Sequence, residues 1–359
     1  MLLDAANAFN SVNRKAALLN ARREWPRAST FLFNSYQSPS ELFVQASNES
    51  LFSYEGTTQD NPLSMLFYGM ALMPMIRRLR NPSHYIQSFY ADDGAACGGL
   101  EELKTWLQKI CKIGPKYGYF PEPSKSILVV NEKFIADAKT LFEPMGLTVV
   151  TGSRYLGGFL GQSSGLKDYV YEKVEKWKSQ ILQLKEVANT YPHEAFSVVT
   201  RSIQAKWNFL TRVVPGIKDA LCSLETCLRD EFLENLANKK LTDDERTLYS
   251  LPARMGGLGI CKPTEIAENN FDASSKSGVV LAEAIRNCTM FDVARHKELV
   301  RCSKRESQKL RNEQCRALFS EVRSRAGVIV QKRMDRHFET KTSSWLTTAV
   351  SSRDGLVLS

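Results

Sequence analysis

Two adjacent carboxylates, Asp92 and Asp93, follow an apolar run that predicts a strand, in the stretch SFYADDGAAC. A third carboxylate, Asp4, directly follows the short apolar run of residues 1–3. A strand that ends in a carboxylate and a hairpin that carries two more can converge at one edge of a sheet. Three carboxylates would repel one another there unless cations lay between them. Mg²⁺ suits such a site, because it takes one or two carboxylates and completes its shell with water and substrate phosphates.

Two such ions could lower the pKa of an attacking hydroxyl and stabilise a leaving pyrophosphate. Gly94 would let the backbone turn sharply beside the carboxylates. A second acidic pair in the chain, Asp243 and Asp244, has different neighbours, since it follows Thr242 and precedes ERTLYS. Acids in that context favour the first turn of a helix, through capping and the helix dipole. The neighbouring residues therefore predict a metal site for Asp92 and Asp93 and a helix cap for Asp243 and Asp244.

Short strands and amphipathic helices alternate through residues 1–165, which predicts an α+β fold. Strands are expected at residues 42–46, 51–56, 86–91 and 126–130, and a tight hairpin at residues 154–161. Apolar residues keep helical spacing from Leu63 to Ile76, with Pro62 at the helix start. A second amphipathic helix begins near Leu100 and is expected to end at Gly114 and Pro115.

From residue 166 onward the pattern is helical. Two apolar stripes at helical spacing predict helices that pack on each other, Val170, Val174, Trp177, Ile181 and Leu184 and then Phe196, Val199, Ile203, Trp207 and Leu210. The stretch LPARMGGLGI, residues 251–260, indicates a loop and a domain boundary. No apolar run reaches the roughly 18 residues that a membrane span needs, so no membrane partner is expected.

The formal net charge of +9 is concentrated late in the chain: residues 295–336 hold thirteen Lys or Arg against five acids. Such a segment could lie along a phosphate backbone, or it could be the solvated face of a helix. The eight cysteines occur singly, without a Cys-x-x-Cys pair, which is typical of a reducing interior, in the nucleus or cytoplasm. Cys288, His296 and Cys302 could be the remnant of a metal site.

The four residues Tyr90-Ala91-Asp92-Asp93 resemble the Tyr-x-Asp-Asp box of reverse transcriptases. LLDAANAFNSVNR, EGTTQDNPLSM, EPSKSILVV and RYLGGFLG resemble further motifs of that family and occur in its order, and LPARMGGLGI is typical of non-LTR retrotransposon proteins. The resemblance implies a polymerase palm, with an antiparallel sheet and packed helices, at residues 1–165. A helical thumb at 166–252 and a basic, helical and truncated C-terminal region at 253–359 would follow.

Residue roles also follow from the resemblance. The catalytic residues would be Asp4, Asp92, Asp93 and Lys125, and the three aspartates would hold two Mg²⁺ ions, with Mn²⁺ as a possible substitute. Substrate-binding residues would be Ala5, Phe9, Gly56, Gln59 and Tyr90. The nucleic-acid-binding residues would be Arg301, Lys304, Arg305, Lys309 and Arg311.

Partners of such a protein would be an RNA template, a DNA primer and deoxynucleoside triphosphates. Lys125 would protonate the pyrophosphate, or it is a plain surface lysine. Phe9 would exclude a 2′-hydroxyl, or it is part of the core.

The sequence departs from the family in two places. The usual Gln-Gly-Asp-Pro of the second motif reads Gln59-Asp60-Asn61-Pro62, so a side chain and a charge replace a glycine, and Asn10 stands where the first motif often carries an Asp. The fingers of the family precede the first motif, whereas three residues precede Asp4. We therefore expect little or no polymerase activity from the chain, and the alternative is a non-catalytic, nucleic-acid-binding remnant of a retroelement.

Overall fold

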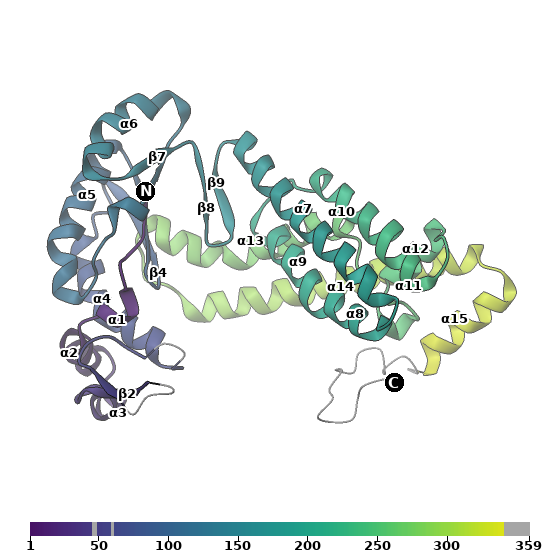
Figure 1. Ribbon diagram of the computed structural model, residues 1–359, viewed down its shortest axis with the longest axis horizontal. Helices are drawn as coiled ribbons and strands as arrows, with labels where there is room; N and C mark the ends of the chain where they lie inside the picture. The colour runs from purple at the N-terminus through teal and green to yellow at the C-terminus, as the bar shows by residue number, and fades with distance from the viewer. Residues whose placement is uncertain (45–48, 59–60, 341–359) are drawn as a thin grey trace. The chain divides into compact units, whose positions relative to one another are not determined.

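The computed structural model describes residues 1–44, 49–58 and 61–340. The chain divides into two compact units (Figure 1). The first comprises Met1–Tyr155, Leu160–Gln162 and Glu283–Met290, and the second comprises Leu156–Phe159, Ser163–Ala282 and Phe291–Ser359. A small mixed sheet with many helices confirms the α+β class. Among the described helices, none combines the length and apolar composition that crossing a membrane requires.

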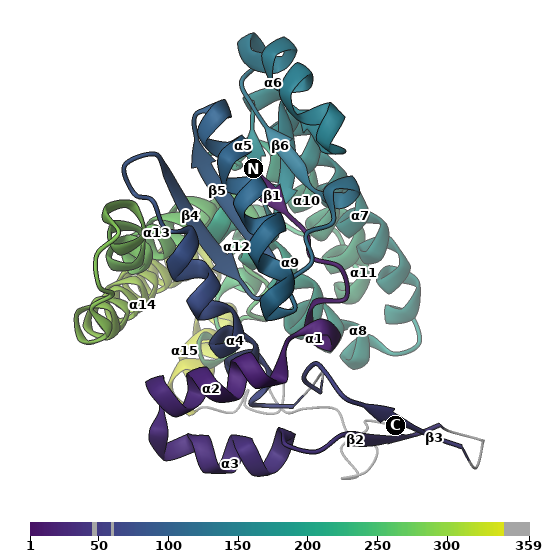
Figure 2. The same ribbon diagram turned by 90° about the vertical axis from the view of Figure 1, so that its left-hand side faces the viewer.

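A five-stranded sheet with the order β4-β5-β1-β6-β7 organises the first unit (Figure 2). The strands are β1 (Leu2–Leu3), β4 (Tyr85–Tyr90), β5 (Asp93–Gly98), β6 (Ile127–Val129) and β7 (Thr148–Val150). β1 pairs antiparallel with both β5 and β6. The expected antiparallel sheet is wrong for one pair, since β6 and β7 are parallel. The chain passes through α6 (Ile135–Phe142) between them, and a parallel pair requires a crossover of this kind.

One face of this sheet is packed against helices. Leu3, Ala96 and Leu128 are buried in a core that they share with Phe67 and Trp106, from α4 (Ser64–Leu79) and α5 (Leu100–Ile113). Successive side chains of a strand point to opposite faces, so Leu2, Ala95 and Val129, which are only partly buried, lie on the other face. The sheet therefore has one covered face and one more open face.

The helices of the first unit confirm the predicted periodicity. In α4, Phe67 and Met70 of the predicted apolar stripe are buried, and only Leu66 departs from the stripe, with 39% of its surface exposed. Tyr68 and Leu72, which were not predicted, are buried as well. The remaining helices here are α1 (Ala8–Ser11), α2 (Arg14–Glu24) and α3 (Pro26–Tyr36). α2 packs against both α3 and α4, which fixes the buried side of α4. Short 3₁₀ turns at Gly114–Tyr117, Pro123–Lys125, Glu132–Phe134 and Glu143–Met145 connect later elements.

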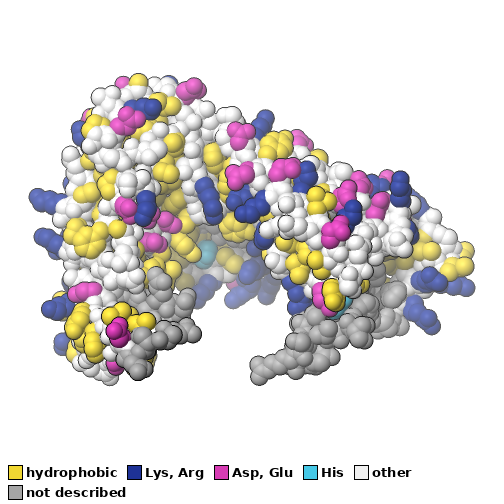
Figure 3. Space-filling model, viewed as in Figure 1, with side chains coloured by type: hydrophobic (Ala, Val, Ile, Leu, Met, Phe, Trp, Pro, Cys, Tyr) yellow, Lys and Arg dark blue, Asp and Glu magenta, His cyan; other side chains and the backbone are white. Residues whose placement is uncertain are grey.

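The two predicted strands near residue 50 form an antiparallel hairpin, β2 (Ser40–Phe43) with β3 (Ser50–Ser53). Its apolar side chains are exposed, and Phe43 has 81% of its surface in contact with solvent. The yellow side chains at the lower left of Figure 3 lie in this part of the unit, which contains α3 and the hairpin. The hairpin is therefore held by something other than burial of its own side chains.

Arg14, at the start of α2, ties this hairpin to the rest of the unit. The residue is 5% exposed. Its guanidinium donates to the carbonyl oxygens of Ser53 and Gly56, at 2.9 Å and 2.8 Å. It also lies 5.6 Å from the ring centroid of Tyr36. A buried charge is tolerated when hydrogen bonds replace its lost hydration, and the backbone carbonyls do so here.

The second unit is helical. Its elements are α7 (Ser163–Ala188), α8 (Pro192–Val198), α9 (Gln204–Val213), α10 (Cys222–Thr226), α11 (Glu234–Ala237), α12 (Asp243–Ser250), α14 (Val293–Arg325), α15 (Val328–Thr340) and most of α13 (Pro263–Asn287), with 3₁₀ turns at Asp219–Leu221 and Ala253–Met255. Both predicted apolar stripes lie in its core, where the rings of Trp177 and Trp207 meet edge to face. Two π-helical segments, Val199–Ile203 and Cys227–Leu233, were not predicted.

The predicted hairpin and the predicted helix cap are both confirmed. β8 (Gly152–Tyr155) and β9 (Gly158–Gly161) are joined by Leu156 and Gly157, which both have positive φ, as a two-residue type I′ turn requires. Asp243 and Asp244 lie in the first turn of α12, where Thr242 forms a capping box with Glu245. The Asp243 and Asp244 carboxylates also bind arginines, Arg229 at 2.8 Å and Arg325 at 3.0 Å.

Replacing Arg14 by Ala should lower the free energy of unfolding by about 3 kcal/mol, because several buried carbonyl oxygens lose their donor at once. Replacing the exposed neighbour Lys15 by Ala should change it by less than about 0.5 kcal/mol. Urea unfolding of both variants measures the difference. Equal effects of the two substitutions would show that Arg14 does not hold the hairpin.

Candidate active site

The strand register brings Asp4 and Asp93 to facing positions. Leu2 pairs with Ala95 and Leu3 with Gly94, where the pairing ends, so Asp4 and Asp93 are the residues that directly follow the last pair. β4 and β5 pair up to Tyr90 and Asp93, which leaves Ala91 and Asp92 as the two residues of the turn. Ala91 has a φ of 54°, the left-handed conformation that such tight hairpin turns use. All three predicted metal-binding aspartates therefore lie at one edge of the sheet.

The open face of the sheet carries Asp4, Asp93 and Tyr90. Leu3, Gly94 and Phe89 belong to the helix-covered face, because Leu3 and Gly94 are buried and Phe89 packs on Trp106. Alternation along each strand then places their neighbours on the opposite face. Tyr90 is 63% exposed beside Asp93.

The other two carboxylates affect the pKa of Asp93. Partial burial raises the pKa of Asp93 above its usual range, and the nearby charges of Asp92 and Asp4 raise the pKa further. Both effects disfavour the ionised form of a carboxyl group. A cation between these groups would reverse the second effect.

The side chains of this site do not form a finished metal cluster. Within residues 1–44, 49–58 and 61–340, no three His, Cys, Asp or Glu side chains converge as they would around an ion. The same result applies to the suggested set of Cys288, His296 and Cys302. For the three aspartates, the donor chemistry fits Mg²⁺ or Mn²⁺, since all the ligands are carboxylate oxygens. The carboxylates would have to rotate toward one another to hold an ion.

Two buried tyrosines that the sequence did not single out lie beneath the turn. The hydroxyl of Tyr119 donates to the backbone carbonyl of Asp92 at 3.0 Å. A Cβ at Gly94 would lie 2.9 Å from that hydroxyl, so glycine makes room for Tyr119. The hydroxyl of Tyr68 is buried without a hydrogen-bond partner among the described residues. Burial raises the pKa of both tyrosines, and the Asp92 charge adds to the effect.

Phe9 and Gly56 lie close together in the structure. The ring of Phe9 is partly buried and stacks on Tyr68, with centroids 4.7 Å apart. The backbone N–H of Thr57 donates to the carbonyl of Phe9 at 2.7 Å. Gly56 has a φ of 80°, and a Cβ there would lie 2.4 Å from the backbone oxygen of Asn10, so the position requires glycine. Gln59 and Asp60 lie outside the described residues.

Asp4, Ala5 and Lys125 are joined through one segment. The N–H of Asp4 donates to the Ser126 hydroxyl at 3.2 Å, and buried Ala5 forms an antiparallel bridge with Pro121. The ammonium group of Lys125 lies 2.8 Å from a Glu122 oxygen, and 61% of the side chain is exposed. That hydrogen bond to Glu122 is the main cause that raises the pKa of Lys125, and the Asp4 charge contributes. Lys125 is therefore a surface cation within electrostatic range of Asp4.

The five predicted nucleic-acid-binding residues all lie on α14 in the second unit, and all five are exposed: Arg301, Lys304, Arg305, Lys309 and Arg311. Arg301 forms an ion pair with Glu298 at 2.8 Å, and Lys309 lies 4.0 Å from Glu313. Ser303, Phe319 and Val322 of the same helix are buried, and the guanidinium of Arg311 donates to the sulfur of Cys261 at 2.9 Å. The five basic residues are thus exposed on a helix that is packed at other positions along its length.

No protein-family model matches the chain, and no curated protein matches it.

Replacing Asp93 by Asn should stabilise the protein at pH 7 without divalent cations, by at most about 1 kcal/mol because the group is partly solvated. The raised pKa of Asp93 makes its charge unfavourable in the folded state. The stabilisation by Asp93→Asn should be complete above the raised pKa of the folded state. It should vanish as the pH falls below the pKa of the unfolded chain, near 3.8. Thermal unfolding as a function of pH measures it.

Asp243→Asn is the matched control, and it should destabilise the protein, because this carboxylate lies at a helix N-terminus and binds Arg229. Millimolar Mg²⁺ should raise the melting temperature of the unaltered protein more than that of the Asp93→Asn variant. A lower melting temperature for Asp93→Asn in the absence of metal would contradict the repulsion inferred at this edge.

Proposed function

We propose that this chain carries the palm and thumb of an RNA-directed DNA polymerase of the non-LTR retrotransposon type. The observation that supports the proposal most is the register that pairs Leu3 with Gly94, so that Asp4 follows the last pair beside the Tyr90-Ala91-Asp92-Asp93 turn. In the reaction, the 3′-hydroxyl oxygen of a primer forms a bond with the α-phosphorus of a deoxynucleotide, and the bond from that phosphorus to pyrophosphate breaks.

Asp4, Asp92 and Asp93 would hold two Mg²⁺ ions, and Mn²⁺ could replace them. When bound, the ions would lower the pKa of the primer hydroxyl and stabilise the charge on pyrophosphate. Tyr119 would keep the Asp92 backbone in place through its hydrogen bond. Catalysis of this kind is mostly positioning and charge stabilisation, which fixed elements of a sheet can supply.

Other residues of the site would serve the substrates. Tyr90, exposed on the open face, would lie against the primer. Phe9 has its ring fixed against Tyr68, and it would exclude the 2′-hydroxyl of a ribonucleotide. Lys125 is held protonated by Glu122, and it would donate a proton to pyrophosphate.

The second motif, Gln59-Asp60-Asn61-Pro62, favours weak polymerase activity. Asp60 replaces a glycine and adds a negative charge where the phosphates of a nucleotide would bind. Like charges there would reduce nucleotide affinity. We therefore propose that the chain extends primers poorly.

A primer-extension assay with an RNA template, a DNA primer, deoxynucleotides and Mg²⁺ tests this function. The unaltered chain should extend weakly, and Asp60→Gly should raise extension about tenfold, equivalent to about 1.4 kcal/mol of recovered transition-state stabilisation. The double change Asp92→Ala, Asp93→Ala should abolish extension in either background.

The matched double change Asp243→Ala, Asp244→Ala in the helix cap should leave any extension in place, at a temperature where the variant is folded. Extension that persists in the Asp92→Ala, Asp93→Ala variant would contradict the assignment. Robust extension by the unaltered chain would contradict the proposed weakness.

Non-catalytic binding of nucleic acid is the second candidate function, and the exposed cations of α14 favour it. Binding of single-stranded RNA should weaken with salt, because neutralised phosphates release counterions. Changing Arg301, Lys304, Arg305 and Arg311 to Ala should reduce the slope of log K against log salt by up to about 3. The Asp92→Ala, Asp93→Ala variant should keep the original slope. An unchanged slope after the four substitutions would exclude α14 as the contact.

A further inference from the structure

A small pocket of about 90 Å³ opens in the second unit. It lies between α9, α13, α14 and the segment that leads into α13. Most of the residues that line it are polar, among them Asn208, Arg212, Asn269, Ser307, Arg311 and Gln314. None of the residues assigned to the polymerase site lines it.

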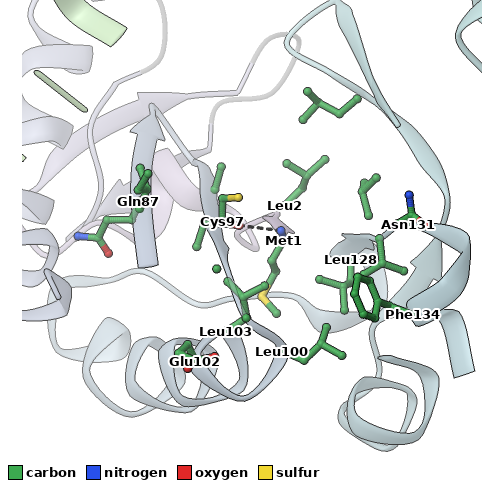
Figure 4. A pocket seen from close by; sticks show the side chains of 18 of the residues that line it. Met1, Leu2, Gln87, Cys97, Leu100, Glu102, Leu103, Leu128, Asn131 and Phe134 are labelled. Atoms are coloured by element: carbon green, nitrogen blue, oxygen red, sulfur yellow. Dashed lines mark hydrogen bonds between the residues drawn. The ribbon is translucent and has the colours of Figure 1, made fainter. Parts of the chain in front are cut away.

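The charges of this pocket favour an anion. Arg212 and Arg311 line it, and no Asp or Glu does so among the described residues. A larger pocket of about 840 Å³ in the first unit has the opposite character (Figure 4). Its charged lining residues are Glu101, Glu102 and Asp137, and its described lining includes no Lys or Arg. An anion is therefore attracted to the small pocket and repelled from the large one.

Hydrogen bonds between helices hold the walls of the small pocket in place. The amide of Asn270, on α13, donates to the hydroxyl of Thr211, on α9, at 2.9 Å. The amide of Asn269 donates to the side-chain oxygen of Gln314, on α14, at 3.4 Å. The walls are thus formed without a ligand, which lowers the entropic cost of binding one.

Arg311 is oriented by a buried thiol. Its guanidinium donates to the sulfur of Cys261 at 2.9 Å, and that thiol donates in turn to the carbonyl of Gly259 at 3.8 Å. Cys261 also lines the pocket, so this contact holds the guanidinium beside it. A thiol is a weak acceptor, and neither Arg311 nor Arg212 forms an ion pair within the part of the chain that the structure describes. Both guanidinium groups can therefore bind an anion.

An unmatched polar atom also indicates a ligand. The Oδ1 atom of Asn208 is buried without a hydrogen-bond partner among the described residues. Buried polar atoms nearly always have a partner, so this side chain calls for one. A half-turn of the amide puts its NH₂ group in the place of Oδ1, which lets Asn208 donate to an anion. Ser307 adds a hydroxyl that can donate as well.

The size of the pocket indicates how much of a ligand it holds. Sites for whole small molecules measure about 300–1,000 Å³, so this pocket takes one group and leaves the rest of the ligand outside. A water molecule takes about 30 Å³, so the room is that of about three waters. Outside it on α14 lie the exposed residues Lys304 and Arg305, and Lys304 is one helical turn from Ser307.

A nucleic-acid strand fits these requirements, since one phosphate can enter the pocket while its neighbours lie along the exposed cations. Arginine binds phosphate through parallel N–H donors. Donors that come from both α9 and α14 match the several directions in which a tetrahedral phosphate accepts hydrogen bonds.

We propose that the pocket binds one backbone phosphate of a single-stranded RNA, between Arg212 and Arg311. Ser307 and Asn208 donate to the remaining phosphate oxygens. The proposal rests on the second candidate function, nucleic-acid binding by α14, and adds to it a formed site in which α9 takes part. It does not depend on the polymerase function.

Binding of a fluorescent oligouridine, followed by anisotropy over a range of NaCl concentrations, tests the proposal. Arg212→Gln should weaken binding about tenfold at low salt, because charged hydrogen bonds are lost. It should also reduce the slope of log K against log salt by about 0.7, the value for one phosphate of a single strand. The matched control is Arg333→Gln, at an exposed residue of α15 outside the lining, which should leave the slope unchanged.

Ser307→Leu separates the pocket from general charge, because it fills the room and leaves every charge in place. It should reduce the slope by the same amount, about 0.7. The double change Arg212→Gln, Ser307→Leu should reduce it no further, since both substitutions remove the same phosphate contact. Melting followed by circular dichroism shows which variants are folded, and Arg212→Gln keeps the test valid if Ser307→Leu does not fold.

Three results would overturn the proposal, and they differ in what they leave standing. The slope may fall when Arg301, Lys304, Arg305 and Arg311 are changed to Ala but not with Arg212→Gln or Ser307→Leu. That result would reject the pocket and keep nucleic-acid binding by α14. Binding of radiolabelled inorganic phosphate as tight as that of the oligouridine, in equilibrium dialysis, would identify a free anion as the ligand. No salt-dependent binding of the oligouridine at all would reject the second candidate function itself.

Discussion

The pairing of the two-residue strand β1 between β5 and β6 is the constraint on which the rest of the site depends. Because Leu3 pairs with Gly94, Asp4 leaves the sheet next to Asp93. A slip of one residue would turn Asp4 toward the helix-covered face, because side chains alternate along a strand. Burial of Leu3 and Leu128 opposes such a slip, so hydrophobic packing on one face holds like charges together on the other.

The structure compensates for this repulsion locally. The site remains partly solvated, and Tyr119 holds the turn through the Asp92 carbonyl and not through a carboxylate, which leaves all three acidic groups available. Phe9 and Gly56 are joined to the same region by backbone hydrogen bonds and by the Tyr68 ring. The second acidic pair has a different environment, because Asp243 and Asp244 lie at the start of a helix and bind arginines.

Local signals in the sequence predicted the elements with local causes. Leu156 and Gly157 form the expected turn, Thr242 caps its helix, and Trp177 and Trp207 pack as their spacing predicts. Features that depend on distant residues were not predicted. The parallel pairing of β6 with β7, the burial of Arg14 and the hydrogen bond from Tyr119 to Asp92 each join segments that the sequence does not relate. The sequence predicted that Asp4 and Asp93 lie near each other only because a strand end and a hairpin were expected to converge at one edge of the sheet.

We propose that Asp4, Asp92 and Asp93 form one cation site. Anomalous X-ray diffraction from crystals of the protein soaked in Mn²⁺ would locate a bound ion. We expect an anomalous peak between the carboxylates of Asp4 and Asp93, with these side chains rotated toward it, and no peak at Asp243 and Asp244. If no peak lies beside Asp93 at millimolar Mn²⁺ and the carboxylates stay apart, these aspartates do not form a cation site.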